Sequence, residues 1–352
     1  MNMLPNCHER IVCAKISYTP RHVNLETAAR LLAGEHIVPN VGDLVLAQVD
    51  KIGQHAALEL TTGRRANLFP GDEIVVCYGH RYAPDQFEAE VPRTLAPCHL
   101  VAAGGIAAWA LTWHTDMKSP TAIAPVGLLA DANGQRLNLS GAGVAKHNHL
   151  YNSPHIVAVV GTAMNAGKTT TAANLIHGLT SAGLKVGAAK VTGTGSGNDI
   201  WFMRDAGAKL TLDFTDAGFP STYRATVAQV ENIFTTLISH LAKAGMDVIV
   251  VEVADGLYQA ETAALLDSPV FANAVNNVIF AAGDAMGAAA GVEWLQRKGL
   301  PLLAVSGLLT ASPLAITEAG TATGLPVLTK SMLRNAAIAT ELGMYSSIAR
   351  SA

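Results

Sequence analysis

The feature that most constrains the fold is a glycine-bounded loop, Gly161-Thr-Ala-Met-Asn-Ala-Gly167, which continues into Lys168-Thr169-Thr170. An apolar run at 156–160 precedes it, and a helical pattern begins at Lys168. Glycines let such a loop curl until its N–H groups point at phosphate oxygens, and the N-terminus of the following helix adds partial positive charge. We therefore expect a phosphate-binding loop (P-loop). The residues expected to hold the nucleotide are Gly161, Thr162, Asn165, Ala166, Gly167, Lys168, Thr169 and Thr170.

Two side chains of this loop are expected to take part in chemistry. Lys168 would reach the β- and γ-phosphates and offset charge that develops during phosphoryl transfer. The Thr169 hydroxyl would bind Mg²⁺, a cation that prefers oxygen ligands.

The C-terminal part of the chain alternates between apolar strands and helices, which predicts a doubly wound α/β domain with a mostly parallel sheet. Its strand patterns are continuous apolar runs, as expected when helices cover both faces of a sheet. Strands are predicted at 156–160, 186–191, 248–253, 278–282, 302–305 and 326–328. Helices are predicted at 168–182, 200–206, 227–244, 288–298 and 332–342.

The N-terminal part has short strand patterns separated by turn signals, which indicate a smaller β-rich domain of the barrel-like kind. Strands are predicted at 11–16, 44–49, 57–60 and 73–78, and one helix at 25–33, capped by Asn24. The expected domains are 1–144 (β-rich), 145–154 (linker) and 155–352 (nucleotide-binding). A dense polar and aromatic stretch at 78–88 is either a substrate or subunit contact or an ordinary hairpin. The connector region contains three closely spaced histidines, His147, His149 and His155. It has no carboxylate or cysteine to complete a metal-ligand set, so a solvated linker is favoured over a metal site.

Composition excludes several classes of protein. The chain has 352 residues, which is enough for about two domains. Half of its residues are hydrophobic, which excludes a disordered chain. Its net charge of −3 argues against nucleic acid as a partner. The longest apolar stretch, 98–113, is too short and too interrupted to span a membrane. The start of the chain lacks the pattern of a signal peptide, and the four cysteines form no framework, so we expect a cytoplasmic protein with reduced thiols.

Five residues separate Gly161 from Gly167, one more than in the common P-loop, and this spacing resembles the dethiobiotin synthetase and cobyrinate amidase family. The resemblance covers roughly 156–343. Lys190 ends the second strand, where the family holds its substrate. Asp199 and Glu252 match the family's Mg²⁺ ligands, so the resemblance implies a metal site of Thr169, Asp199 and Glu252. Lys190 would orient the acceptor.

Two loops at the carboxyl ends of strands are candidate substrate contacts, because ligands of open α/β sheets bind at that edge. The run at 192–197 loosely resembles a glycine- and threonine-rich segment of the N-acetyl-D-glutamate kinase family, and a flexible loop is the alternative. The run at 254–262 follows the strand expected to end in the metal ligand Glu252, and Asp255 there is a candidate catalytic group. The substrate candidates are Thr192, Gly193, Thr194, Arg204, Tyr258 and Glu261, with Arg204 equally suited to a salt bridge elsewhere.

The favoured function is Mg²⁺- and ATP-dependent phosphorylation of a small carboxylate or carbamate, as a kinase or as the first step of a ligase. The absence of an Asn-Lys-x-Asp run favours ATP over GTP, and no cysteine suits a glutamine amidotransferase. The alternatives are a nucleotide-switch protein, such as a molybdopterin-guanine dinucleotide accessory protein, and a nucleotide-binding scaffold without turnover. We also expect a homo-oligomer, a dimer.

Overall fold

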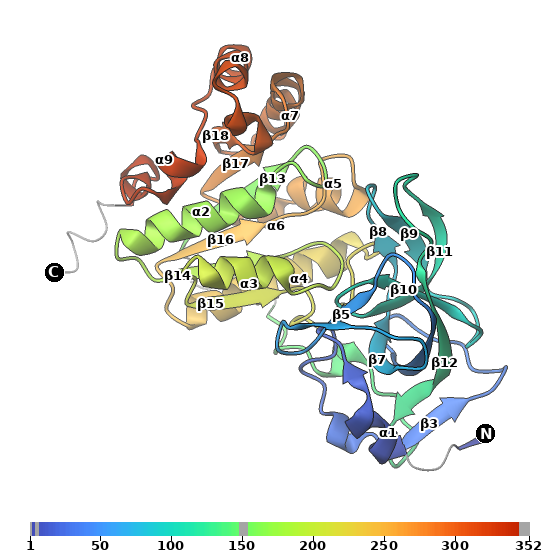
Figure 1. Ribbon diagram of the computed structural model, residues 1–352. Coiled ribbons are helices and arrows are strands. Elements are labelled where there is room, and N and C mark those ends of the chain that lie inside the picture. The colour runs from blue at the N-terminus through green and yellow to red at the C-terminus, as the bar shows by residue number, and fades with distance from the viewer. Residues whose placement is uncertain (1, 4–6, 148–153, 345–352) are drawn as a thin grey trace. The chain divides into compact units, whose positions relative to one another are not determined.

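The computed structural model describes residues 2–3, 7–147 and 154–344. The chain forms two compact units (Figure 1). The first comprises 1–145 together with 193–198 and 214–224, and the second comprises 146–192, 199–213 and 225–352. The sequence predicts a C-terminal domain that is continuous from residue 155. Instead, two short segments that follow strands of the second unit belong to the first.

The first unit is built almost entirely of strands. They are β1 (Asn2–Met3), β2 (Lys15–Ile16), β3 (Arg30–Ala33), β4 (Leu44–Lys51), β5 (Ala57–Glu59), β6 (Arg65–Asn67), β7 (Glu73–Tyr78), β8 (Arg81–Tyr82), β9 (Phe87–Glu90), β10 (Cys98–Ala102), β11 (Ile106–Trp113) and β12 (Thr121–Ala130). One α-helix, α1 (Cys7–Cys13), and the 3₁₀ turns η1 (Leu25–Thr27) and η2 (Leu139–Gly141) complete the described part of this unit.

Five of these strands pair in a closed ring. Around it, β4 pairs with β7, β7 with β11, β11 with β10, β10 with β12, and β12 with β4. The residues of β4 alternate between two cores, because successive side chains of a strand point to opposite faces. Val45 and Ala47 belong to one buried cluster, whereas Leu44 and Leu46 belong to another that includes Ile11 of α1.

Two predicted elements of this unit are wrong. The segment 11–16 is not one strand: its first part is the end of α1, where Ile11 and Cys7 lie one turn apart and pack into the same cluster. The predicted helix at 25–33 is a 3₁₀ turn followed by β3. The neighbours Leu31 and Leu32 are buried in different clusters, which a strand allows and a helix does not. Asn24 does cap the turn, accepting a hydrogen bond from the Glu26 N–H at 3.1 Å.

The second unit alternates strands and helices, which confirms the predicted α/β class. Its strands are β13 (His155–Gly161), β14 (Val186–Lys190), β15 (Leu210–Asp213), β16 (Val248–Glu252), β17 (Asn277–Ala281) and β18 (Leu302–Ser306). Its helices are α2 (Lys168–Ser181), α3 (Asn198–Asp205), α4 (Val227–Lys243), α5 (Ala260–Leu266), α6 (Pro269–Ala274), α7 (Ala285–Arg297), α8 (Pro313–Thr323), α9 (Lys330–Arg334) and α10 (Ile338–Glu341), with the 3₁₀ turn η3 (Leu308–Ala311). The predicted last strand, 326–328, is only a bridge from Val327 to Val305.

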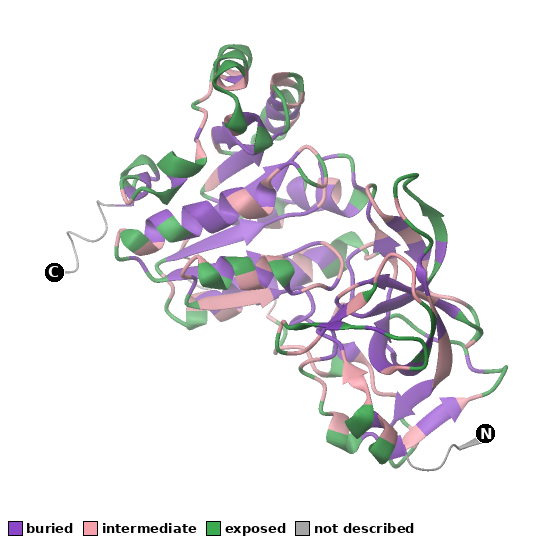
Figure 2. Cartoon of the chain, viewed as in Figure 1, coloured by how far each residue is buried: buried purple, intermediate pink, exposed green. Residues whose placement is uncertain are grey.

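The six strands form one parallel sheet in the order β15-β14-β16-β13-β17-β18. On one face, α2, α3, α9 and α10 bury a core with strand residues such as Val157 and Val250. On the other, α4 and α7 approach Gly187 and Phe280. Figure 2 shows β16 in the centre of the sheet as buried, the edge strand β15 as mostly intermediate, and the outer sides of α2 and α3 as exposed. The P-loop therefore sits at the carboxyl edge of a central strand, where such sheets bind ligands.

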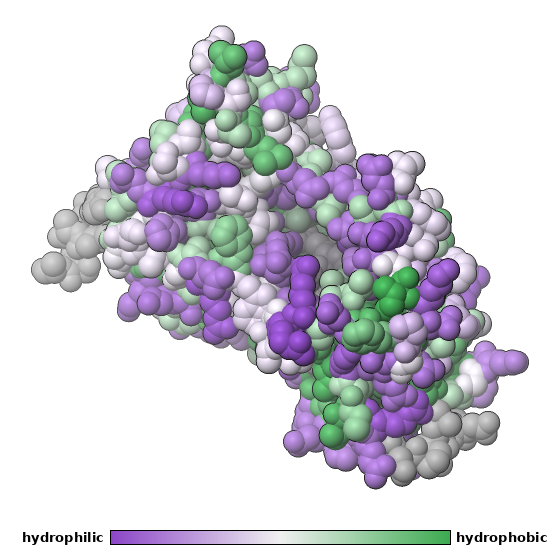
Figure 3. Space-filling model, viewed as in Figure 1, coloured by the Kyte–Doolittle hydropathy of each residue, from purple (hydrophilic) through white to green (hydrophobic). Residues whose placement is uncertain are grey.

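On the face shown in Figure 3, most of the surface is hydrophilic, and hydrophobic residues form small patches within it. Within the described residues, none of the helices combines the length and apolar character needed to cross a bilayer. All four cysteines are free thiols; Cys7, Cys77 and Cys98 are buried and Cys13 is exposed.

Candidate nucleotide and metal site

The P-loop joins β13 to α2 through two residues with left-handed backbone, Asn165 (φ 63°) and Gly167 (φ 97°). Gly167 is the N-cap of α2 and has no side chain to accept from the N–H groups of the first helical turn. Those groups are left for a ligand, and the helix dipole makes an anion the favoured one. This is the backbone arrangement that the glycine spacing predicts.

Gly161 is required by the path of the Lys168 side chain. A Cβ at Gly161 would lie 2.8 Å from the Lys168 Cγ and 2.8 Å from the Ala281 carbonyl oxygen. The lysine folds back along the loop, and its Nζ donates to the Ala163 carbonyl oxygen at 2.7 Å. Burial lowers the pKa of Lys168, an effect that nearby carboxylates only partly offset. A phosphate would supply the negative charge that this buried ammonium lacks.

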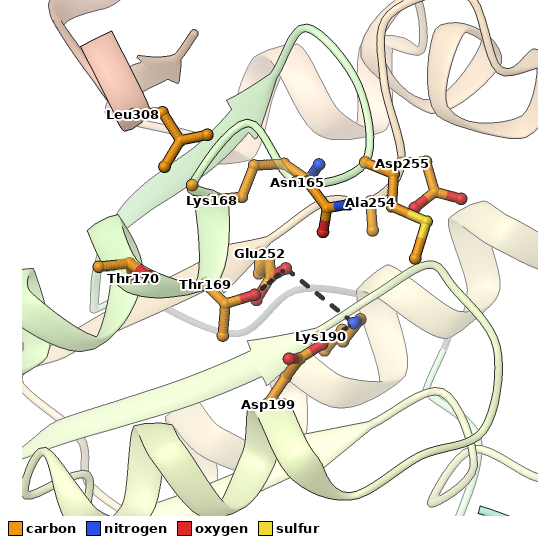
Figure 4. Close-up of a pocket in the computed structure, with 12 residues that line it drawn as sticks. Asn165, Lys168, Thr169, Thr170, Lys190, Asp199, Glu252, Ala254, Asp255 and Leu308 are labelled. Carbon is orange, nitrogen blue, oxygen red and sulfur yellow. Dashed lines mark hydrogen bonds and ion pairs between the residues drawn. The ribbon is translucent and has the colours of Figure 1, made fainter. Parts of the chain in front are cut away.

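Thr169, Lys190, Asp199 and Glu252 converge next to the loop (Figure 4). The Thr169 hydroxyl donates to Glu252 Oε1 at 2.9 Å. Lys190 forms an ion pair with Asp199, and its Nζ lies 4.0 Å from Glu252 Oε1. The proximity of Lys190 and Glu252 follows from strand register, because they are partners on the adjacent strands β14 and β16.

Burial and charge act against each other in this cluster. Burial by itself would lower the pKa of Lys190, but the carboxylates of Asp199 and Glu252 outweigh it and raise that pKa. Burial likewise favours the neutral form of Asp199, yet the Lys190 ammonium lowers the Asp199 pKa. Glu252 is different: burial dominates and raises its pKa. The second oxygen of Glu252, Oε2, is buried and has no hydrogen-bond partner.

These residues fit a bound Mg²⁺. An anionic oxygen buried without a donor is costly unless a cation or a proton reaches it. Glu252 supplies such an oxygen, Thr169 a hydroxyl beside it and Asp199 a second carboxylate, a hard oxygen set of the kind Mg²⁺ takes together with phosphate oxygens and water. Bound there, the ion would neutralise phosphate charge and polarise the phosphoryl oxygens.

A cavity of about 300 Å³ unites most of the predicted site. Asp255 lines it, as do Asn165, Gly167, Lys168, Thr169 and Thr170 of the loop. Three other lining residues, Met164, Ala254 and Leu308, were not among the predicted site residues, although Met164 and Ala254 lie in the predicted loops at 161–167 and 254–262. The Leu308 N–H donates to the Ala166 carbonyl oxygen of the P-loop at 3.1 Å. Gly256 and Gly307 were also not predicted as site residues. They pack directly against the P-loop, because a Cβ on either would lie within 2.6 Å of a P-loop carbonyl oxygen.

The proposed substrate residues do not line this cavity. Thr192 is buried and donates its hydroxyl to the Ala254 carbonyl oxygen. Gly193 and Thr194 belong to the first unit, where they contact Thr222 and Ser221. Arg204 is exposed on α3 beside the Trp201 ring. Tyr258 is 89% exposed, and Glu261 accepts a hydrogen bond from Gln259.

The connector histidines do not form a metal site in the described residues. His155 contacts the side-chain oxygen of Asn277 at 2.6 Å, and the His147 ring packs against His240 at 4.9 Å. His149 lies outside the residues that the structure describes. Across the described ranges, no group of three or more histidine, cysteine, aspartate or glutamate side chains is placed to hold a metal.

A family model, molybdopterin guanine dinucleotide synthesis protein B, matches residues 156–260. The match covers less than a third of the chain and includes the P-loop, Lys190, Asp199 and Glu252. It is a different P-loop family from dethiobiotin synthetase, which the motifs favoured, and it corresponds to the accessory-protein alternative. No curated protein matches the chain.

Solved structures also match the chain, at low similarity. The signal recognition particle 54 kDa protein from Aeropyrum pernix K1, in complex with GDP, is 23% identical with a TM-score of 0.38, over 57% of this chain and 49% of that one. The receptor FtsY from Elizabethkingia anophelis, in complex with GDP, is 18% identical with a TM-score of 0.37, over 51% and 58%. The chain thus spans only about half the length of these structures. Its C-terminal unit is a P-loop nucleotide-binding domain whose first half is similar to molybdopterin guanine dinucleotide synthesis protein B.

Proposed function

We propose that the chain is a Mg²⁺-dependent nucleotide-binding accessory protein that serves the formation or handling of molybdopterin guanine dinucleotide. The match over 156–260 supports the biological context. Thr169, Asp199 and Glu252 are the proposed ligands of the metal, and Lys168 is the proposed phosphate-binding lysine. ATP is the proposed nucleotide, on the absence of an Asn-Lys-x-Asp run.

The observation that carries this proposal over a kinase is the position of Lys190. Phosphorylation of a small carboxylate requires a cation that is available to hold the acceptor. The Lys190 side chain is only 12% exposed and is already paired with Asp199 beside Glu252. Lys190 therefore belongs with the metal and phosphate groups, where a nucleotide-dependent change can act on the ion pair. The predicted acceptor-binding role for Lys190 is not part of this proposal.

The test compares binding with chemistry in the full chain. We expect MgATP to raise the melting temperature, with stabilisation of about 2.7 kcal/mol at a hundredfold excess over the dissociation constant. MgGTP is measured beside it, and a larger shift with MgGTP would reject ATP as the nucleotide. We expect slow hydrolysis and no phosphorylated acceptor over a panel of small carboxylates. Formation of an acyl phosphate at the rate of nucleotide consumption would reject the accessory role in favour of a kinase.

The biological part of the proposal needs a cellular measurement. Cells that lack this chain should contain less molybdopterin guanine dinucleotide, measured by chromatography of extracted cofactor. Wild-type chain should restore the amount, whereas the Lys168→Ala variant should not. An unchanged cofactor level in the deletion would refute this context while leaving nucleotide binding intact.

A further inference from the structure

A second cavity, of about 320 Å³, lies wholly within the first unit. Its lining includes Tyr82, Gln86, Glu88, Thr112, Trp113 and His114. Most of it comes from the polar and aromatic stretch at 78–88, to which the nucleotide site gives no role. Three of its residues form one row across neighbouring strands, because Tyr82 pairs with Glu88 and Glu88 pairs with Thr112.

The cavity presents aromatic rings. Trp113 is 47% exposed, and the side chain of His114 is 42% exposed. Large aromatic side chains gain free energy by leaving water, so partly exposed aromatic side chains that line one cavity suit a flat apolar ligand surface. Tyr82 is held in place by Tyr223, with ring centroids 5.4 Å apart. A braced ring loses little conformational freedom when a ligand stacks on it.

The polar side chains of the cavity offer hydrogen-bond acceptors and a donor to the edge of a planar ligand. Glu88 accepts from the Tyr223 hydroxyl and from the Thr112 hydroxyl, each at 3.3 Å, which is longer than the usual 2.5–3.0 Å for such bonds. A carboxylate has about four acceptor positions, so Glu88 has capacity for two further donors. The side-chain oxygen Oε1 of Gln86 accepts from the Arg81 guanidinium at 2.7 Å, which leaves the side-chain NH₂ group of Gln86 as the donor for a ligand.

We propose that this cavity binds a 2-aminopyrimidin-4-one ring, the ring system that guanine and pterin share. Its adjacent ring N–H and amino N–H are parallel donors that match the two oxygens of Glu88, and Gln86 donates to a ring acceptor. The ring face stacks on the aromatic side chains. The choice of this ring, over other planar heterocycles, rests on the proposed function, since molybdopterin guanine dinucleotide contains both pterin and guanine.

Equilibrium dialysis of the full chain with pterin, and separately with guanosine, tests the proposal and distinguishes the two sources of the ring. Binding of one or both is expected, and the tighter ligand identifies the source. Lumazine, in which an oxygen replaces the 2-amino group, should bind at least about tenfold more weakly than pterin, as expected for loss of a bidentate contact. Equal binding of lumazine and pterin, or no binding of pterin and guanosine, would overturn the proposal.

Variants locate the binding. Glu88→Gln and Trp113→Ala should each weaken it by about tenfold or more. Trp109→Phe is the matched control, because Trp109 is 50% exposed on the same strand but does not line the cavity, and it should retain wild-type affinity. Lys168→Ala should also retain it. Loss in Lys168→Ala with retention in Glu88→Gln would place the ring at the P-loop and reject this cavity. If the chain binds pterin or guanosine but binds neither MgATP nor MgGTP, the proposed function is rejected and the proposal for this cavity stands.

Discussion

Replacing Lys190 with alanine tests whether this lysine occupies the place of a metal cation. The change removes the ammonium that separates two carboxylates, Asp199 and Glu252, whose side chains are 23% and 2% exposed. Removing one partner of a buried ion pair costs about 3–5 kcal/mol, and the partial exposure of Asp199 favours the lower end of that range. For a unit of about 190 residues, a loss of about 3 kcal/mol lowers the melting temperature by roughly 6–12 °C.

Magnesium should reverse much of this loss, because a divalent cation replaces the missing charge between the same oxygens. We therefore expect Mg²⁺ alone to raise the melting temperature of Lys190→Ala by several degrees more than that of the wild type. Scanning calorimetry with and without Mg²⁺ measures both quantities. Lys298→Ala is the matched control: it breaks an exposed ion pair with Asp267 in the same unit and should shift the melting temperature by less than about 2 °C. Equal Mg²⁺ shifts in Lys190→Ala and wild type would refute the reasoning.

Four further changes have defined outcomes. Lys168→Ala should abolish the thermal shift by magnesium nucleotide while leaving the apo melting temperature within about 2 °C, and a shift of wild-type size would contradict the phosphate-loop assignment. Gly161→Ala should also lose nucleotide binding, measured by titration calorimetry, because its Cβ would meet the Lys168 stem at 2.8 Å. The pKa of Asp199 is lowered in the folded state, so its ionised carboxylate stabilises the fold at pH values above its ordinary pKa of 3.8. This stabilisation is lost as the pH falls through the lower pKa of the folded state. Asp199→Asn should therefore remove this acid dependence of the free energy of unfolding, measured by unfolding curves at several pH values. Glu59→Ala removes the acceptor of the buried Gly197 N–H, now bonded at 3.0 Å, and should speed hydrogen exchange within 193–198; unchanged exchange would exclude an anchoring role for Glu59.

The elements that sequence predicts well are those encoded by short contiguous patterns. The helix at 227–244 agrees with α4 (Val227–Lys243), where Thr226 and Gln229 form a capping box and one face is apolar. The strand at 73–78 agrees with β7 in full. By contrast, the predicted helix at 332–342 is broken at Asn335 into α9 and α10. The strands β8 and β9 form a hairpin, one of the two readings of the stretch at 78–88. The strands β10 to β12 were not predicted; β11 and β12 pair with β7 and β4, which lie far along the chain, and such distant pairing leaves no mark in a short stretch of residues.

The sequence by itself determined the phosphate loop and the parallel sheet that carries it. Gly161 and Gly167 encode the backbone locally, and the lysine and threonine follow within two residues. Only the tertiary structure decided the role open to Lys190. Its partners are Asp199, across a loop whose residues 193–198 belong to the other unit, and Glu252, brought opposite it by the register of β14 and β16. Charge pairs of this kind depend on strand order and burial, which are properties of the assembled sheet and are not written in any short stretch of residues.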